Sequence, residues 1–192
     1  MEIDTGTNEL LCVVREGVAL ITLNRPEARN AMSEKLTPAL RAQIRERGDD
    51  PDVGAILITG AGTAFCSAGD VKSMGGRSAR TQLSFEDRLR DLRWRQMGLT
   101  GALVGLRKPT IAALPGAAAG AGLALALACD IRIAAKSAFA STGYARVGLS
   151  GDYGIAWLRC GCRRRGRWQG PRRPRRRAGR RWWACASQPA RR

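Results

Sequence analysis

Short apolar runs separated by turn residues predict the strands of this chain. The expected strands are, in chain order, Leu10–Arg15, Val18–Leu23, Val53–Thr59, Thr110–Leu114, Ile131–Ala134 and a short Phe139–Thr142. Glu16-Gly17 separates the first two runs and suits a tight turn, so we expect an N-terminal β-hairpin. The third run is almost wholly apolar, which predicts a strand covered on both faces.

Apolar residues at helical spacing predict helices between these strands. The first helix is expected to start at Ser33, which can cap its N-terminus, and to end at about Gly48. Another covers Phe85 to about Leu106, and a further one is the small-residue segment Gly120–Cys129. Because strands alternate with helices along the chain, the pattern predicts an α/β architecture.

Two glycine-bearing loops follow apolar strands, Gly60–Asp70 and Pro115–Gly122. Neither has the spacing of a dinucleotide-binding turn, because Phe65 and Leu125 stand where that motif requires its third glycine. Small residues let main-chain N–H groups approach a ligand, and a helix that begins near Gly120 presents unpaired N–H groups there. Two such donors on one oxygen would form an oxyanion hole, whereas the alternative is that both segments are only tight turns.

Positive charge is concentrated at the C-terminus. The 192 residues include 33 Lys and Arg against 16 Asp and Glu, a net charge of +17. Residues 159–192 contain 14 arginines and no acidic residue, so residues 1–158 carry a net charge of only +3. The C-terminal segment also lacks Ile, Leu, Val, Phe and Tyr. We therefore divide the chain into a core, 1–158, and an arginine-rich tail, 159–192, which we expect to be disordered.

The arginine-rich tail allows two interpretations. Its arginines are interleaved with Trp168, Trp182 and Trp183, a combination that can neutralise phosphates and stack on bases. Its few residue types are also those that GC-rich codons encode in any frame, which favours an out-of-frame sequence in place of another C-terminus. We prefer the second interpretation and keep a nucleic-acid-binding protein as the alternative function.

The absence of histidine excludes several kinds of site. No Ser-His-Asp or Cys-His nucleophile and no histidine-containing zinc site can be built from this chain. Cys160, Cys162 and Cys185 form no CxxC pair, so no metal site is expected. The N-terminus lacks a signal-peptide pattern, and Pro115-Gly116 interrupts the uncharged segment Pro109–Cys129. We therefore expect a cytoplasmic protein that does not enter a membrane.

Three segments together resemble the crotonase (enoyl-CoA hydratase/isomerase) superfamily. They are Ile21–Ala31, Ala64–Lys72 and Lys108–Gly122, the last followed by Cys129-Asp130, and they come in the family's order and at its usual intervals. The resemblance covers about residues 10–158. It implies an α/β, crotonase-like spiral of ββα units, here without the family's C-terminal helical segment. It also implies an enzyme of fatty acid metabolism, a hydratase (a lyase) or an isomerase, that acts on acyl-CoA thioesters. Intact relatives are expected to form homotrimers or hexamers.

The resemblance also implies roles for particular residues. Gly69 and Ala121 match the two positions whose backbone N–H groups form the family's oxyanion hole. The positions that match CoA-binding residues are Ala28, Asn30, Ala31, Ser67, Ala68, Asp70 and Val71. Coenzyme A would then enter as part of the substrate, with no permanently bound cofactor and no metal.

The acid and base positions separate hydratases from isomerases in this family. The resemblance places the two hydratase glutamates at Ala124 and at Tyr144 or its neighbour, so neither is present. Asp152 matches the acidic position of several isomerase-type members, although an aspartate in a glycine-rich loop also forms turns. One carboxylate suffices to move a proton between two carbons, which favours an isomerase with an enolate-like intermediate over a hydratase.

The C-terminal helices that this sequence lacks cap the acyl pocket and form much of the subunit interface in the family. Without them we expect apolar surface of the core to be exposed, and a chain that is inactive or poorly folded.

Overall fold

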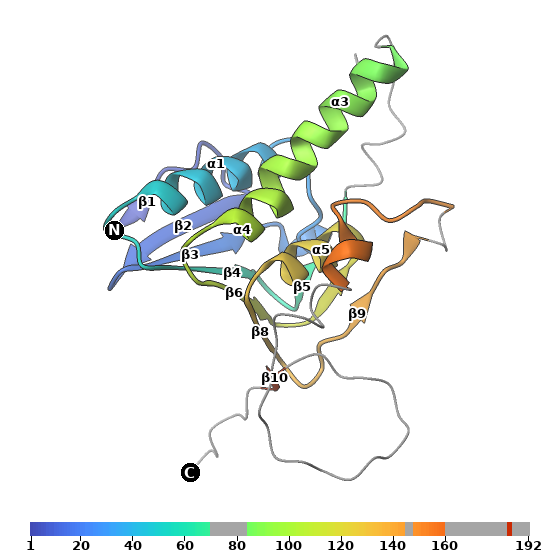
Figure 1. Cartoon of the computed structure of the whole chain (residues 1–192). Helices are drawn as coiled ribbons and strands as arrows, with labels where there is room; N and C mark the ends of the chain where they lie inside the picture. Colours follow the sequence, from blue (N-terminus) through green and yellow to red (C-terminus); the bar gives the residue numbers. More distant parts are fainter. Residues whose placement is uncertain (70–83, 145–147, 160–183, 186–192) are drawn as a thin grey trace.

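The computed structural model describes residues 1–69, 84–144, 148–159 and 184–185 (Figure 1). Its strands are β1 (Glu2–Ile3), β2 (Leu10–Arg15), β3 (Val18–Leu23), β4 (Ala55–Gly60), β5 (Ala64–Cys66), β6 (Thr110–Leu114), β7 (Ala117–Ala119), β8 (Ile131–Ala134), β9 (Ala140–Ser141) and β10 (Ala184–Cys185). Its helices are α1 (Leu36–Asp49), α3 (Phe85–Gln96), α4 (Ala102–Gly105) and α5 (Gly120–Ala128), with a 3-10 turn η1 (Pro26–Ala28) and a π-helical segment η3 (Met97–Gly101). Residues 155–159 add a helical turn. Strands and helices alternate, so the predicted α/β class is confirmed.

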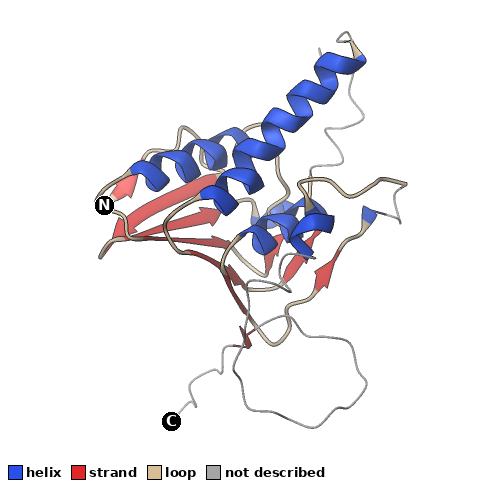
Figure 2. Cartoon of the chain, viewed as in Figure 1, coloured by secondary structure: helices blue, strands red, loops and turns tan. Residues whose placement is uncertain are grey.

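Most strands form one mixed sheet (Figure 2). Its strand order is β1-β2-β3-β4-β6-β8-β10, in which β1–β2 and β2–β3 are antiparallel and every later pair is parallel. The predicted hairpin is confirmed as β2 and β3. Glu16 (φ 52°) and Gly17 (φ 75°) both lie in the left-handed region, as a two-residue hairpin turn requires.

A second, smaller sheet has the order β5-β7-β9, and both of its pairs are parallel. This sheet corrects the sequence-based prediction, because Gly60–Asp70 and Pro115–Gly122 were expected to be loops and contain β5 and β7. β7 consists of three alanines, and alanine has a low preference for strands. The short strands form because they are buried beside each other, which their own residue types do not indicate.

The helices lie on one side of the large sheet (Figure 2), and the hydrophobic core lies between the helices and the sheet. α1 packs on β2, β3 and β4 through Leu36, Leu40 and Ile44, which are fully buried. α1 begins at Leu36, three residues after the predicted start at Ser33, and the Ser33 hydroxyl accepts the N–H of Leu36 over 2.9 Å. α5 packs mainly against the small sheet and η3.

The opposite side of the large sheet exposes apolar side chains. The prediction that the third strand is covered on both faces is wrong, because β4 alternates fully buried residues with partly exposed ones. The register aligns Val13, Leu20, Leu57, Ile111 and Ile131 in one row across five strands. Leu20 is 38% exposed and Ile131 is 50% exposed, so the expected exposure of apolar surface is confirmed on this face.

The segment predicted as one helix, Phe85 to about Leu106, is divided by η3 into α3 and α4. Within η3, the Thr100 hydroxyl lies 3.3 Å from the Gln96 carbonyl and 3.1 Å from the Tyr153 carbonyl. A hydroxyl that bonds a preceding carbonyl competes with the regular helical ladder, which is one cause of such local irregularities. α3 projects away from the sheets (Figure 1).

In the arginine-rich tail, the structure describes Arg159 and, as β10, Ala184 and Cys185. β10 pairs with the end of β8 in parallel. The other tail residues lie outside the described residues, so the predictions of disorder and of nucleic-acid binding stay untested.

Candidate active site

The loop that follows β5 is held against an earlier turn of the chain. The Ser67 N–H donates to the Arg29 carbonyl over 3.0 Å, and the Met32 N–H donates to the Ala68 carbonyl over 2.8 Å. Gly69 continues this contact in a parallel bridge with Met32. Main-chain bonds therefore fix the segment that carries Gly69.

α5 begins directly where β7 ends. Its first residue, Gly120, has a φ of 48°, in the left-handed region that favours glycine. A Cβ atom at Gly120 would lie 2.8 Å from Ala68 Cβ, and one at Gly122 would lie 2.5 Å from the Cys66 carbonyl oxygen. Ala121, between the two glycines, is only 4% exposed. The first turn of α5 therefore packs directly on the end of β5, an approach that leaves no room for side chains at Gly120 and Gly122.

The ends of β5 and β7 lie side by side, because the two strands are parallel neighbours. Their register pairs Ala64 with Ala117 and Cys66 with Ala118. Gly69 and Ala121 consequently follow adjacent strands at the same edge of the small sheet. The first N–H groups of a helix have no partner within the helix, and α5 has no acidic residue in its first turn. This edge is suited to a ligand oxygen with partial negative charge.

Asp152 lies near the start of α5 in a hydrogen-bonded pair with Tyr144. The Tyr144 hydroxyl donates to Oδ1 of Asp152, and a Cβ atom at Gly120 would lie 3.7 Å from Tyr144 Cζ. Burial raises the pKa of Asp152, and the hydrogen bond from Tyr144 opposes that rise. Burial first, and then the bond and charge of Asp152, raise the pKa of Tyr144, so the phenol remains a donor at neutral pH.

A comparison with known protein families shows which family this chain belongs to. The profile of the enoyl-CoA hydratase/isomerase family matches residues 14–160. The chain belongs to this family. The match ends within two residues of the composition change that follows Leu158.

Relatives and a solved structure of the enoyl-CoA hydratase/isomerase family match the same part of the chain. A Mycobacterium tuberculosis protein named as a probable enoyl-CoA hydratase, EchA14, is 41% identical over 152 residues, and the Escherichia coli 1,2-epoxyphenylacetyl-CoA isomerase is 35% identical over 153 residues. Both alignments cover 78% of this chain and 56% of the relative. The crystal structure of an enoyl-CoA hydratase from Mycobacterium avium subsp. paratuberculosis K-10 superposes with a TM-score of 0.67 at 26% identity, over 80% of this chain and 55% of that chain. The chain thus spans little more than half the length of these relatives, and the predicted crotonase-like fold is confirmed.

Asn30, which the family resemblance placed in the CoA-binding turn, holds that turn to the start of β5. Its side chain is fully buried. Its Oδ1 accepts the Arg25 N–H over 2.8 Å, and its Nδ2 donates to the carbonyls of Ala61 and Ala64 over 2.9 and 2.8 Å. Because both amide protons are used within the protein, this side chain shapes the turn. Its predicted contact with CoA stays a prediction.

The other predicted CoA-binding residues fall in two segments that touch each other. The Ser67 hydroxyl donates to the Ala28 carbonyl over 3.3 Å, and Ala31 is buried three residues after the 3-10 turn ends, next to Asn30. Ala68, with a φ of 92°, lies against Gly120 as described above. The remaining two positions predicted to bind CoA, Asp70 and Val71, lie outside the described residues.

The family resemblance placed the two hydratase glutamates at Ala124 and at Tyr144 or its neighbour. Ala124 is fully buried among the core residues of α5, so it offers no group that could act as an acid or base. Tyr144 is the partner of Asp152, a bond that sequence reasoning missed. A tyrosine at or next to the position where the resemblance placed an acidic residue does not by itself identify a partner eight residues later.

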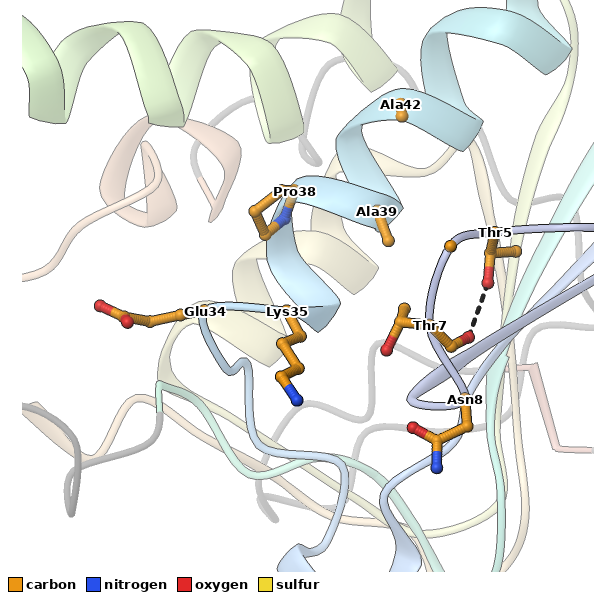
Figure 3. A pocket seen from close by; sticks show the side chains of 9 residues that line it. Thr5, Thr7, Asn8, Glu34, Lys35, Pro38, Ala39 and Ala42 are labelled. Carbon is orange, nitrogen blue, oxygen red and sulfur yellow. Dashed lines mark hydrogen bonds between the residues drawn. The ribbon is translucent and has the colours of Figure 1, made fainter.

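An open groove of about 700 Å³ lies elsewhere, between residues 5–8 and the start of α1 (Figure 3). The Thr5 hydroxyl donates to the Thr7 carbonyl over 2.8 Å at its edge, and Lys35 is among its lining residues. None of the candidate residues lines this groove, so it is separate from the candidate active site.

The part of the chain that the structure describes lacks two further kinds of feature. It contains no group of three or more Cys, Asp or Glu side chains placed to hold a metal ion. None of its helices combines the length and apolar character needed to cross a membrane.

Proposed function

We propose that the backbone N–H groups of Gly69 and Ala121 bind the thioester oxygen of an acyl-CoA substrate and stabilise it as an enolate. The single observation that carries this proposal is the parallel pairing of β5 with β7, which brings the two segments to one edge of the small sheet. The direct packing of Gly120 on Ala68 supports it, because it places the start of α5 against the segment that carries Gly69. Donors aimed at a developing oxyanion are commonly worth about 2.7–4 kcal/mol each.

We assign the CoA part of the substrate to the two segments that border this edge. Residues 28–31 and 67–69 lie against each other through the bonds of Ser67 with Arg29 and Ala28. The thioester carbon of an acyl-CoA is attached to the CoA moiety, so a CoA-binding surface must adjoin the oxyanion donors. These segments meet that requirement.

Asp152 is the base in this proposal. Its carboxylate takes a proton from the carbon next to the thioester, and the electron pair of that C–H bond moves into the enolate. The enolate then takes the same proton back at a more distant carbon, which shifts the double bond without any net gain or loss of atoms. A raised pKa makes the Asp152 carboxylate a stronger base than an exposed aspartate. Because Ala124 supplies no second carboxylate, we favour isomerisation over hydration.

The oxyanion donors are tested by removing one N–H at a time. Ala121→Pro places proline in the first turn of α5, where helices tolerate it, and Gly69→Pro removes the other donor. The probe is acetoacetyl-CoA, whose enolate is followed by its ultraviolet absorbance. We expect wild-type protein to bind it as the enolate and each variant to lose about tenfold or more in affinity.

Lys136→Pro is the matched control. Lys136 is the second residue of a turn closed by the Ala138 N–H and the Ala135 carbonyl over 3.0 Å, a position that favours proline. It should bind the probe like wild type. If both donor variants fold, as judged by circular dichroism, and still bind the enolate with wild-type affinity, the proposal is wrong.

The preference for isomerisation needs a separate test. The chain is offered a 3-enoyl-CoA and a 2-enoyl-CoA, and the products are separated by chromatography. We expect the first to be converted to its conjugated isomer and Asp152→Asn to abolish that conversion. Hydration of the second substrate at a higher rate would contradict this preference and leave the oxyanion assignment standing.

A further inference from the structure

We propose that Tyr144 is a positioning residue that holds the Asp152 carboxylate at the start of α5 through its phenolic hydroxyl. The proposal rests on the role given to Asp152 above, and it adds a residue to that role. Tyr144 itself need not touch the substrate.

The first support is the hydrogen bond itself. The Tyr144 hydroxyl donates to Oδ1 of Asp152, which fixes one carboxylate oxygen and leaves the second available. Both side chains are partly buried, so the bond is shielded from full competition by water. The backbone N–H of Asp152 is the other donor that acts on this carboxylate, so Tyr144 supplies the side-chain bond that orients it.

The second support is the packing of the tyrosine ring. A Cβ atom at Gly120 would lie 3.7 Å from Tyr144 Cζ, and one at Gly151 would lie 3.9 Å from Cδ2 and Cε2 of the same ring. The ring thus contacts both the first residue of α5 and the residue before Asp152. Its backbone is also fixed, because the Leu149 N–H donates to the Tyr144 carbonyl over 3.0 Å. Tyr144 is therefore the physical link between the candidate base and the helix that carries Ala121.

The third support is electrostatic. Burial raises the pKa of Asp152, and the bond from Tyr144 is the side-chain interaction that lowers it again. Other charged and titratable groups nearby shift the pKa of Tyr153. Burial raises that pKa most, Asp152 and Cys66 raise it further, and Arg41 and Arg95 lower it. The charges of Asp152 and Tyr153 raise the pKa of Tyr144. A neutral donor at position 144 thus helps to keep the buried carboxylate ionised, which a second carboxylate there would oppose.

Tyr144→Phe is the decisive variant, because it keeps the ring between Gly120 and Gly151 and removes only the hydroxyl. The full chain is labelled with ¹³C at the aspartate side chains, the Asp152 signal is assigned with Asp152→Asn, and its titration is followed by NMR. We expect the Asp152 carboxyl to titrate at higher pH in Tyr144→Phe than in wild type. Tyr153→Phe is the matched control, because Asp152 acts on that phenol through its charge; it should leave the Asp152 titration much closer to wild type.

An unchanged Asp152 titration in folded Tyr144→Phe would overturn the proposal. If that variant fails to fold, the proposal is tested by titrating the tyrosine in Asp152→Asn instead. In a Tyr153→Phe background, Tyr144 is the only tyrosine of the chain. Asp152→Asn then removes the charge that raises the pKa of Tyr144, so this tyrosine should ionise at lower pH in an ultraviolet titration. No such change would overturn the proposal as well.

Kinetics then separates this proposal from the proposed function. Where isomerisation is measurable, Tyr144→Phe should reduce kcat about tenfold, leave KM nearly unchanged and move the acidic limb of the pH profile upward. A merely structural role would lower the amount of active protein without moving that limb. Loss of thioester binding in the donor variants tests the oxyanion hole, and the NMR titration needs no activity, so the two proposals can fail independently.

Discussion

The contact between α5 and β5 is most directly tested at Gly122. In Gly122→Ala the added methyl group would lie 2.5 Å from the Cys66 carbonyl oxygen and 2.7 Å from its sulfur. Ordinary van der Waals contact begins at 3.4 Å, so the start of α5 and the end of β5 must separate by about 0.9 Å. The carbonyl belongs to the backbone of a buried strand and cannot turn aside as a flexible side chain could.

The expected cost follows from two opposing effects. Overpacking of this kind lowers the free energy of unfolding by about 1–3 kcal/mol, and the higher helix propensity of alanine offsets up to about 1 kcal/mol of that loss. The net loss of stability is about 1–2 kcal/mol, which lowers the Tm of a chain of this size by about 2–8 °C. A displacement of this size between the segments that carry Gly69 and Ala121 should also weaken binding of the acetoacetyl-CoA enolate by about 10–100-fold.

Thermal unfolding followed by circular dichroism and enolate absorbance are the two assays. Gly105→Ala is the matched control, since Gly105 is also helical and a Cβ atom there meets nothing within 4 Å. That control should bind the enolate like wild type and be equally or slightly more stable. Wild-type stability and affinity in Gly122→Ala would refute the argument that close packing of α5 on β5 sets the site.

Two further predictions concern Asn30 and Asp152. Asn30→Ala removes three hydrogen bonds to backbone groups, one buried and two partly buried, and should cost about 3 kcal/mol or more in chemical denaturation. Asn24→Ala removes one exposed bond to the Asn8 carbonyl and should cost less than about 0.5 kcal/mol; equal costs would show that the bonds of Asn30 are unimportant. Because burial raises the pKa of Asp152 in the folded state, the folded chain binds this proton more readily than the unfolded chain. The contribution of this group to stability is then present below its unfolded pKa and is lost as the pH rises through its folded pKa. Asp152→Asn should accordingly raise the Tm at neutral pH, with a difference from wild type that shrinks under acid conditions, and a lower Tm at neutral pH would contradict this sign.

The hairpin and the small sheet show which parts of the fold sequence patterns can predict. The bounds of β2 and β3 agree with the prediction because two long apolar runs flank a turn whose residues accept a left-handed backbone. β5 and β7 escaped prediction because three-residue strands carry no periodicity, and the alanines of β7 have no preference that would reveal them. Their formation depends on burial between other elements, which a local pattern does not contain.

Some features of the candidate site could likewise be predicted from the sequence, and others could not. Gly69 and Ala121 could be proposed in advance because their loops carry family-like residues, and the structure adds that their strands are neighbours. The bond between Tyr144 and Asp152 could not be proposed, because the loop between them gives no pattern that fixes which side chains meet. The resemblance assigned Asn30 to CoA binding, which stays a prediction, and the structure adds that its fully buried amide is bonded to three backbone groups of the protein.

The parallel pairing of β5 with β7 has a consequence for how such a protein can diversify. The groups that it brings together are peptide amides, which every residue except proline possesses, so they survive almost any exchange of side chains that the space allows. In the proposed function, the side chains at Ala124, Tyr144 and Asp152 can vary without removing the two amides that would bind the thioester oxygen. One scaffold can then support new reactions by changing its proton-transfer groups, while the chemistry common to all of them is inherited through the main chain.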